Sequence, residues 1–247
     1  MKRILSAIAM VLMLTCFSVS AFAGEQAKEG NWDFNLAPLY LWMVDMEGDI
    51  GIDQTVLPVD VDFGTIFDNL EEVFTVHFEA MHRSNWGLFF DYSYLDISAS
   101  PSPLTIDMTS TLIEAGGVYR TENGPHTFDM FGGVRYTKVE PDITIGSPPP
   151  LVSISEDWYD PFVGIRYDYD FGNKWRLSAR GDIGGFGVGC DFTWNVTAMV
   201  HFQAWKYADI VVGYRVLDQD YEDGTGSSRF KYDMNLAGPL LALNIVW

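Results

Sequence analysis

The feature that most constrains this chain is an alternation of apolar and polar residues with a period of two. In residues 32–43 every even-numbered position is apolar: Trp32, Phe34, Leu36, Pro38, Tyr40 and Trp42. The same alternation runs through residues 73–83, and helical spacing is nearly absent. Because successive side chains of a β-strand point to opposite faces, the sequence predicts an all-β fold whose strands have one apolar and one polar face.

The alternation predicts ten strands, at about residues 32–43, 73–83, 86–98, 105–120, 126–140, 157–171, 174–184, 190–204, 208–222 and 229–247. Short turns at 83–85, 123–125, 172–173 and 205–207 alternate with longer links at 44–71, 99–104, 141–156, 185–189 and 223–228. This order is typical of an up-and-down antiparallel transmembrane β-barrel with tight periplasmic turns and larger outer loops. Residues 48–63 also alternate, so an extra hairpin could extend above the membrane or raise the strand count to twelve; eight strands is the other alternative.

The N-terminal segment has the order of a cleavable secretory signal. Lys2 and Arg3 precede an apolar run over residues 4–17, which is followed by the small-residue site at residues 21–23. We therefore expect a signal peptide at 1–23 and a single barrel domain at 24–247. Cys16 would be removed with the signal peptide. Cys190 would then be the single cysteine of the mature chain, so no internal disulfide could form. A lipoprotein acylated at Cys16 is the alternative, although Thr15 is a poor residue before such a cysteine.

Composition narrows the class of protein further. The 247 residues are 48% hydrophobic and 20% charged, and acids outnumber Lys and Arg by 34 to 15. The chain is too apolar for a disordered protein and too acidic to neutralise nucleic-acid phosphates. Beyond the signal, no run of about 20 apolar residues could form a transmembrane helix.

The tryptophans test the topology independently. The predicted topology places five of them at periplasmic strand ends, namely Trp32, Trp86, Trp175, Trp205 and Trp247. The other three lie near the outer strand ends: Trp42, Trp158 and Trp194. Indole rings prefer the headgroup zone, so this distribution predicts two aromatic girdles. The alternating apolar C-terminus, ending in Trp247, is typical of the signal that directs such barrels to their insertion machinery.

A soluble β-sandwich or lipocalin-like barrel would show the same periodicity with its faces exchanged. The apolar face is nearly uncharged in mid-strand, whereas the polar face carries charged residues there. These residues are Glu79, Asp91, Glu114, Asp129, Arg135, Arg166, Arg180, Asp182 and Arg215. Together with the girdles and the C-terminus, this contrast favours a membrane barrel with a charged lumen and an outer-membrane location.

Three segments and the closing residues 238–241 carry a family resemblance. Residues 161–167 (PFVGIRY), 181–189 (GDIGGFGVG) and 213–215 (GYR) resemble a group of small Gram-negative outer-membrane β-barrel proteins, porin-like or OmpA-like in form. The resemblance spans most of residues 24–247 and is most specific in the C-terminal half. It implies fold and location, and it supplies no catalytic residues.

The lumen charges leave two interpretations open. The acids Glu79, Asp91 and Glu114 lie on strands two to four, and the four arginines lie on strands five to nine, three of them two residues after a glycine that would leave room for the guanidinium. The two walls either pair across a filled lumen, giving a structural barrel, or leave a slit that passes small polar solutes or ions. Conductance separates these interpretations.

The outer connections form the second candidate site. Acidic residues dominate two of them: Asp45, Glu47, Asp49, Asp53, Asp60, Asp62, Asp68, Glu71 and Glu72 in the first, and Asp218, Asp220, Glu222 and Asp223 near the last. This acidic surface could bind divalent cations or an adhesion partner, or it is a solvated loop surface. The spacing from Asp218 resembles a calcium loop only weakly, because Asp223 stands where the motif needs glycine.

An enzyme is the third class. His77 and Glu79 share the lumen face, but we expect a structural hydrogen bond there and predict no catalytic residues. The sequence predicts no resident metal and no cofactor. The expected partners are outer-membrane lipid, lipopolysaccharide and the barrel insertion machinery, with divalent cations as a further candidate; we expect a monomer that binds no nucleic acid.

Overall fold

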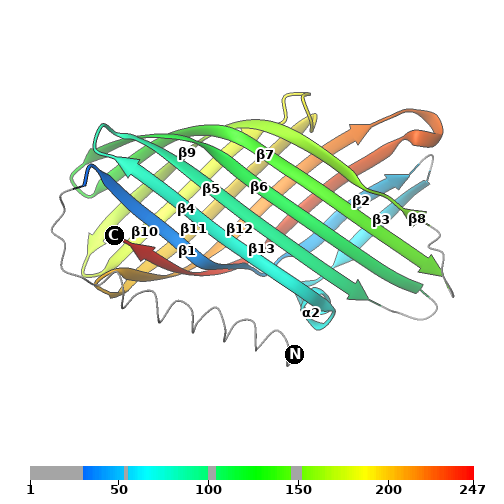
Figure 1. Ribbon diagram of the computed structural model, residues 1–247, viewed down its shortest axis with the longest axis horizontal. Helices are drawn as coiled ribbons and strands as arrows, with labels where there is room; N and C mark the ends of the chain where they lie inside the picture. Colours follow the sequence, from blue (N-terminus) through cyan, green and yellow to red (C-terminus); the bar gives the residue numbers. More distant parts are fainter. Residues whose placement is uncertain (1–29, 53–54, 100–103, 146–151) are drawn as a thin grey trace.

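The computed structural model describes residues 30–52, 55–99, 104–145 and 152–247, so the expected signal peptide at 1–23 lies outside the described residues. Ten antiparallel strands form a closed barrel, which confirms the predicted fold class and strand count (Figure 1). They are β1 (Trp32–Trp42), β4 (Leu70–His82), β5 (Trp86–Ala99), β6 (Leu104–Asn123), β7 (His126–Ile145), β9 (Glu156–Gly172), β10 (Trp175–Gly184), β11 (Phe192–Trp205), β12 (Ala208–Asp223) and β13 (Phe230–Val246). Pairing of β1 with β13, from Asn35↔Val246 to Trp42↔Leu240, closes the ring.

The extra hairpin predicted within residues 48–63 is present, but it adds no strand to the ring. Strand β2 (Asp45–Ile52) continues along β13 where β1 stops, starting at Asp45↔Ala237, and β3 (Thr55–Val61) pairs with β2. The hairpin therefore extends the wall beyond β1. A short helix, α2 (Phe63–Asp68), then leads into β4; β8 (Val152–Ser153) pairs with β7, and a 3-10 turn, η1 (Gly226–Ser228), precedes β13.

In the part of the chain that the structure describes, no helix combines the length and the apolar character needed to cross a membrane.

The outer surface carries an apolar belt with an aromatic edge. Large apolar side chains such as Leu88, Met130, Ile165 and Val212 are exposed on the outside of the barrel. The tryptophans predicted for the periplasmic girdle are all exposed as well: Trp32, Trp86, Trp175, Trp205 and Trp247. A belt of this kind is stable in a bilayer and costly in water.

The predicted outer tryptophan girdle is wrong for two of its members. Trp158 is buried inside the barrel, because it has the same strand parity as the lumen residue Arg166. Trp42 packs inside because a register shift between Leu36 and Leu39 reverses the faces of β1, and the Arg215 guanidinium lies 4.7 Å from its ring. A bulge of this kind inserts a residue into one strand and cannot be read from period-two alternation.

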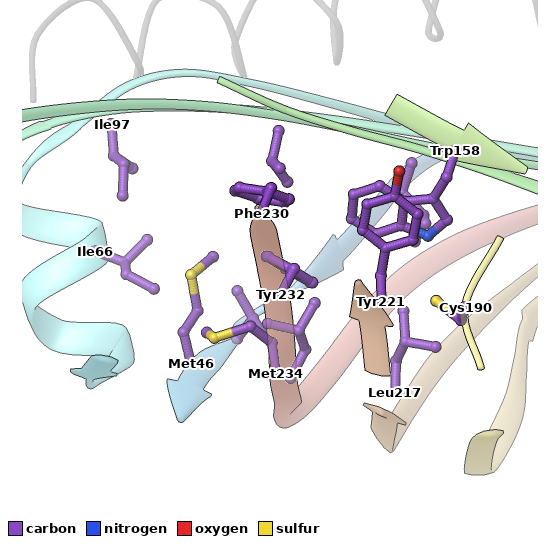
Figure 2. Packing of buried hydrophobic residues seen from close by; sticks show 14 residues of the cluster. Met46, Ile66, Ile97, Trp158, Cys190, Leu217, Tyr221, Phe230, Tyr232 and Met234 are labelled. Carbon is purple, nitrogen blue, oxygen red and sulfur yellow. The ribbon is translucent and has the colours of Figure 1, made fainter. Parts of the chain in front are cut away.

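Among the described residues, the ion-paired charges of the lumen lie in its periplasmic part and the buried Asp160 borders the outer part, so the prediction of a charged lumen needs correction for the outer part. There the interior is a cluster of buried apolar residues that includes Met46, Ile66, Trp158, Tyr232 and Met234 (Figure 2). On the same levels the outward residues of β12 and β13 are polar, as Asp218 and Asp220 show. The outer part of the wall faces water, so its polarity is inverted relative to the membrane part.

Candidate functional site: the charged lumen

Glu114 is the centre of the main lumen network. Its carboxylate accepts hydrogen bonds from Arg135 Nε (2.8 Å), Arg180 Nη2 (2.9 Å) and Arg215 Nη2 (2.9 Å). Asp182 completes the network by accepting from Arg135 Nη2 (2.7 Å) and pairing with Arg180 (3.2 Å). The Glu114 and Arg135 side chains are 1% and 0% exposed, so these charges depend on one another for compensation.

A second network lies closer to the periplasmic turns. Arg120 binds Glu79 (2.9 Å) and Asp129 (2.8 Å), and Arg166 binds the same two carboxylates at 2.7 and 2.5 Å. The structure thus joins Glu79 and Asp129 through shared guanidinium groups. It places Asp91 elsewhere, with its Oδ1 2.7 Å from Nδ1 of His77.

An aromatic cluster touches the guanidinium groups of the main network. Phe89, Phe131 and Phe162 pack together, and the Arg180 guanidinium carbon lies 4.7 Å from the centre of the Phe131 ring. This contact contributes cation–π attraction in a desolvated setting.

Gly164, which stands two residues before Arg166, has a different role from the predicted one. A Cβ on Gly164 would lie 2.5 Å from the Phe131 ring. Gly164 therefore accommodates an aromatic ring of the neighbouring strand β7. The prediction that the glycines make room for guanidinium groups is therefore wrong at Gly164.

The two predicted walls meet. Guanidinium groups from β9, β10 and β12 reach carboxylates on β4 and β6 across the lumen, whereas Arg135 of β7 binds Glu114 on the neighbouring strand β6. Sequence reasoning missed Arg120, which has the strand parity of Glu114 but stands close to a turn. It also missed Asn195, whose amide donates to Asp182 (2.9 Å) and accepts from Arg215 (3.1 Å). Both residues could have been found by continuing the alternation of lumen-facing positions along the whole of each strand.

A small cavity lies beside these charges. It has a volume of about 10 Å³ and lies among His77, Glu79, Arg166 and Arg180, next to the aromatic cluster. This volume corresponds to about one water molecule.

The acidic residues of the outer region lie mostly on strands, not in loops, which corrects the prediction. Asp45, Glu47 and Asp49 belong to β2, Asp60 belongs to β3, and Asp218, Asp220, Glu222 and Asp223 end β12. Asp53 lies outside the described residues. Several have local partners: Asp62 caps α2, Glu222 binds Arg229 (2.7 Å), and Asp218 accepts from Asn235 (3.1 Å). Among the described residues, no group of three or more His, Cys, Asp or Glu side chains is arranged to hold a metal ion.

Comparison with known proteins agrees with the architecture. No protein-family model and no curated protein matches the sequence. The outer-membrane protease OmpT from Escherichia coli has a similar structure, with a TM-score of 0.56, 6% sequence identity, and coverage of 91% of this chain and 99% of OmpT. The fold is that of an outer-membrane β-barrel.

Two further outer-membrane proteins match with lower TM-scores than OmpT. Ail of Yersinia pestis gives 0.39 with 12% identity over 89% of this chain and 99% of Ail. Neisserial surface protein A gives 0.36 with 10% identity over 87% of this chain and 97% of that protein. With the apolar belt and the tryptophan girdle, the fold makes this chain a membrane-spanning barrel of the outer membrane.

Proposed function

We propose that this barrel is a structural component of the outer membrane whose lumen is closed to solutes. The observation that carries the proposal is the pair of ion networks around Glu114 and around Glu79. In these networks Arg215 of β12 reaches Glu114 on β6, and Arg166 of β9 reaches Glu79 on β4, across the lumen. A ring of about eight to ten strands leaves room for side chains and little more. Removing a charge from either network would leave its partners buried and unpaired, so the networks resist opening.

A non-catalytic role is part of the proposal. The His77–Asp91 pair lies inside the lumen, 14–16% exposed, with the Tyr40 ring near the imidazole. Glu79, the predicted partner of His77, is committed to Arg120 and Arg166. A buried pair of this kind is better suited to holding strands together than to activating a nucleophile for an external substrate.

We infer that the partners are lipid, lipopolysaccharide and the insertion machinery. The lipid-facing end of β13 supports this inference: Leu241 is exposed, and the Trp247 ring stacks on Phe34 at 5.5 Å between centroids. Divalent cations remain a predicted partner of the acidic strands.

Conductance of the purified, folded full-length barrel in a planar bilayer tests the proposal. We expect no channel events above the lipid background. Discrete, ion-selective steps would contradict it, provided that Arg180→Gln alters their selectivity and the lipid-facing control Val163→Ala does not. In that case a narrow passage for small polar solutes or ions is the function.

A further inference from the structure

The wall of the barrel has a seam between β1 and β4. Their register runs from Trp32↔His82 only to Ala37↔His77. Beyond it, residues 39–42 pair with β13 alone, while residues 72–76 pair with β5. In the seam itself the Thr75 hydroxyl donates to the Tyr40 carbonyl. A strand needs about 9–11 residues to cross a bilayer, and this pairing ends about halfway, so the seam faces the outer leaflet.

An apolar cavity of about 200 Å³ lies at this seam. Its lining includes the consecutive residues 41–44 of the β1–β2 junction and 93–95 of β5. Residues from both edges of the seam line it, Leu41 and Trp42 on β1 and Val73 and Thr75 on β4, so the cavity lies where the two strands are no longer paired. On the inside it reaches Leu112, Tyr232 and Leu236.

Helix α2 covers the outer end of the seam. Phe63, Ile66 and Phe67 all line the cavity, and Phe67 is exposed. Ile66 is buried among the interior residues (Figure 2). The three residues are spaced i, i+3 and i+4, so they lie on one face of the helix, and that face lines the cavity.

Two polar atoms on this apolar lining lack a partner. Gln219 is 1% exposed; its amide nitrogen donates to Thr137 (2.9 Å), but Oε1 accepts no hydrogen bond. The buried Trp42 Nε1 has no acceptor. A buried acceptor left unpaired is costly, and a ligand group that donates a hydrogen bond to Gln219 Oε1 would satisfy it.

We propose that the cavity binds a single-chain amphiphile with a carboxylic acid or hydroxyl end, of the long-chain fatty acid type, which reaches it sideways from the outer leaflet through the β1–β4 seam. The polar end lies at Gln219, and the hydrocarbon chain fills the apolar lining. The chain of a diacyl lipid ends in a methyl group and would leave Gln219 Oε1 unpaired, so a free amphiphile is the better match. This site is separate from the lumen networks and does not depend on their function.

The test is equilibrium binding of radiolabelled dodecan-1-ol, whose hydroxyl donates and accepts hydrogen bonds, to the full-length barrel in lipid nanodiscs, with empty nanodiscs as background. We expect saturable binding at one site. Leu236→Trp fills the cavity and abolishes this binding, whereas Leu241→Trp, the same change on the lipid-facing side of β13, leaves it unchanged. Gln219→Leu weakens binding about tenfold. Thr137→Val removes the same internal hydrogen bond but keeps the Gln219 acceptor, so binding is preserved.

Folding of each variant is checked by heat-modifiable migration in gels; if Leu236→Trp fails to fold, Val73→Trp in β4 replaces it. Competition defines the ligand class: methyl dodecanoate, which cannot donate a hydrogen bond, should compete about tenfold more weakly than unlabelled dodecan-1-ol. Equal binding by the Leu236→Trp and Leu241→Trp variants, equal competition by the ester, equal displacement by a diacyl phospholipid, or no binding above empty nanodiscs would each overturn the proposal.

Discussion

At the scale of single residues, the lumen depends on carboxylates that each serve several guanidinium groups. Glu114 accepts from Arg135, Arg180 and Arg215, which come from three different strands. A surface ion pair contributes little to stability, but a buried one leaves an uncompensated charge when a partner is lost. The side chain at position 114 therefore stabilises contacts between strands far apart in sequence.

Glu114→Gln keeps the size of the side chain and removes its charge. We expect a loss of about 3 kcal/mol or more in the free energy of unfolding, because three arginines lose their shared carboxylate. Urea unfolding in lipid vesicles measures it. Glu122→Gln, an exposed change on the same strand, should stay within about 0.5 kcal/mol of the wild type. Similar stabilities for both variants would mean that the network is relaxed or hydrated.

At the scale of elements, α2 begins through its N-cap. Asp62 Oδ1 accepts from the Thr65 backbone N–H (3.0 Å), and Oδ2 accepts from the Thr65 hydroxyl (2.9 Å). The hydrogen bond from the Thr65 amide lowers the pKa of the exposed Asp62 carboxyl below its ordinary value. A six-residue helix has little intrinsic stability, so this cap and the burial of Ile66 determine whether it forms.

The cap predicts a pH dependence of α2. Because the folded pKa of Asp62 is below the unfolded one, the stabilisation is complete above the unfolded value, near 4, and is lost as the pH falls through the folded value. Hydrogen exchange at the Asn69 amide, which bonds to the Thr65 carbonyl, measures it after correction for intrinsic rates. We expect protection at pH 7 that falls by pH 3. Asp62→Ala should lack this protection at both values, whereas Asp60→Ala should behave as the wild type.

At the scale of the whole molecule, the polarity of the wall changes with height. In the membrane part, apolar side chains such as Ile165 face outward and charges face the lumen. In the outer part, Asp218 and Asp220 lie on the outward face and Tyr232 and Met234 are buried inside. The solvent outside changes from hydrocarbon to water, so the same alternation serves two opposite arrangements.

This inversion predicts that the effect of an outward charge depends on height. Ile165→Arg places a charge on the lipid-facing surface and should destabilise the barrel by about 2–4 kcal/mol. Asp220→Arg, on the outward face of the water-exposed part, should change stability by less than about 0.5 kcal/mol. Unfolding in vesicles compares the two variants. Equal losses would show that position 220 also lies in the bilayer.

The sequence by itself determined the ten strands, their up-and-down order and the periplasmic tryptophan girdle, because these depend on local alternation and turn residues. It also assigned Glu114, Arg135 and Arg180 to one face. Which charges pair depends on register and on the inclination of the strands, so the tertiary structure decided that Asp91 contacts His77 and that Arg120 joins Glu79. The register shift in β1, the seam beside it and the apolar outer interior were also decided there. The alternation of residues predicts which side chains share a face of a strand. Which residues or solvent that face contacts depends on the closed barrel.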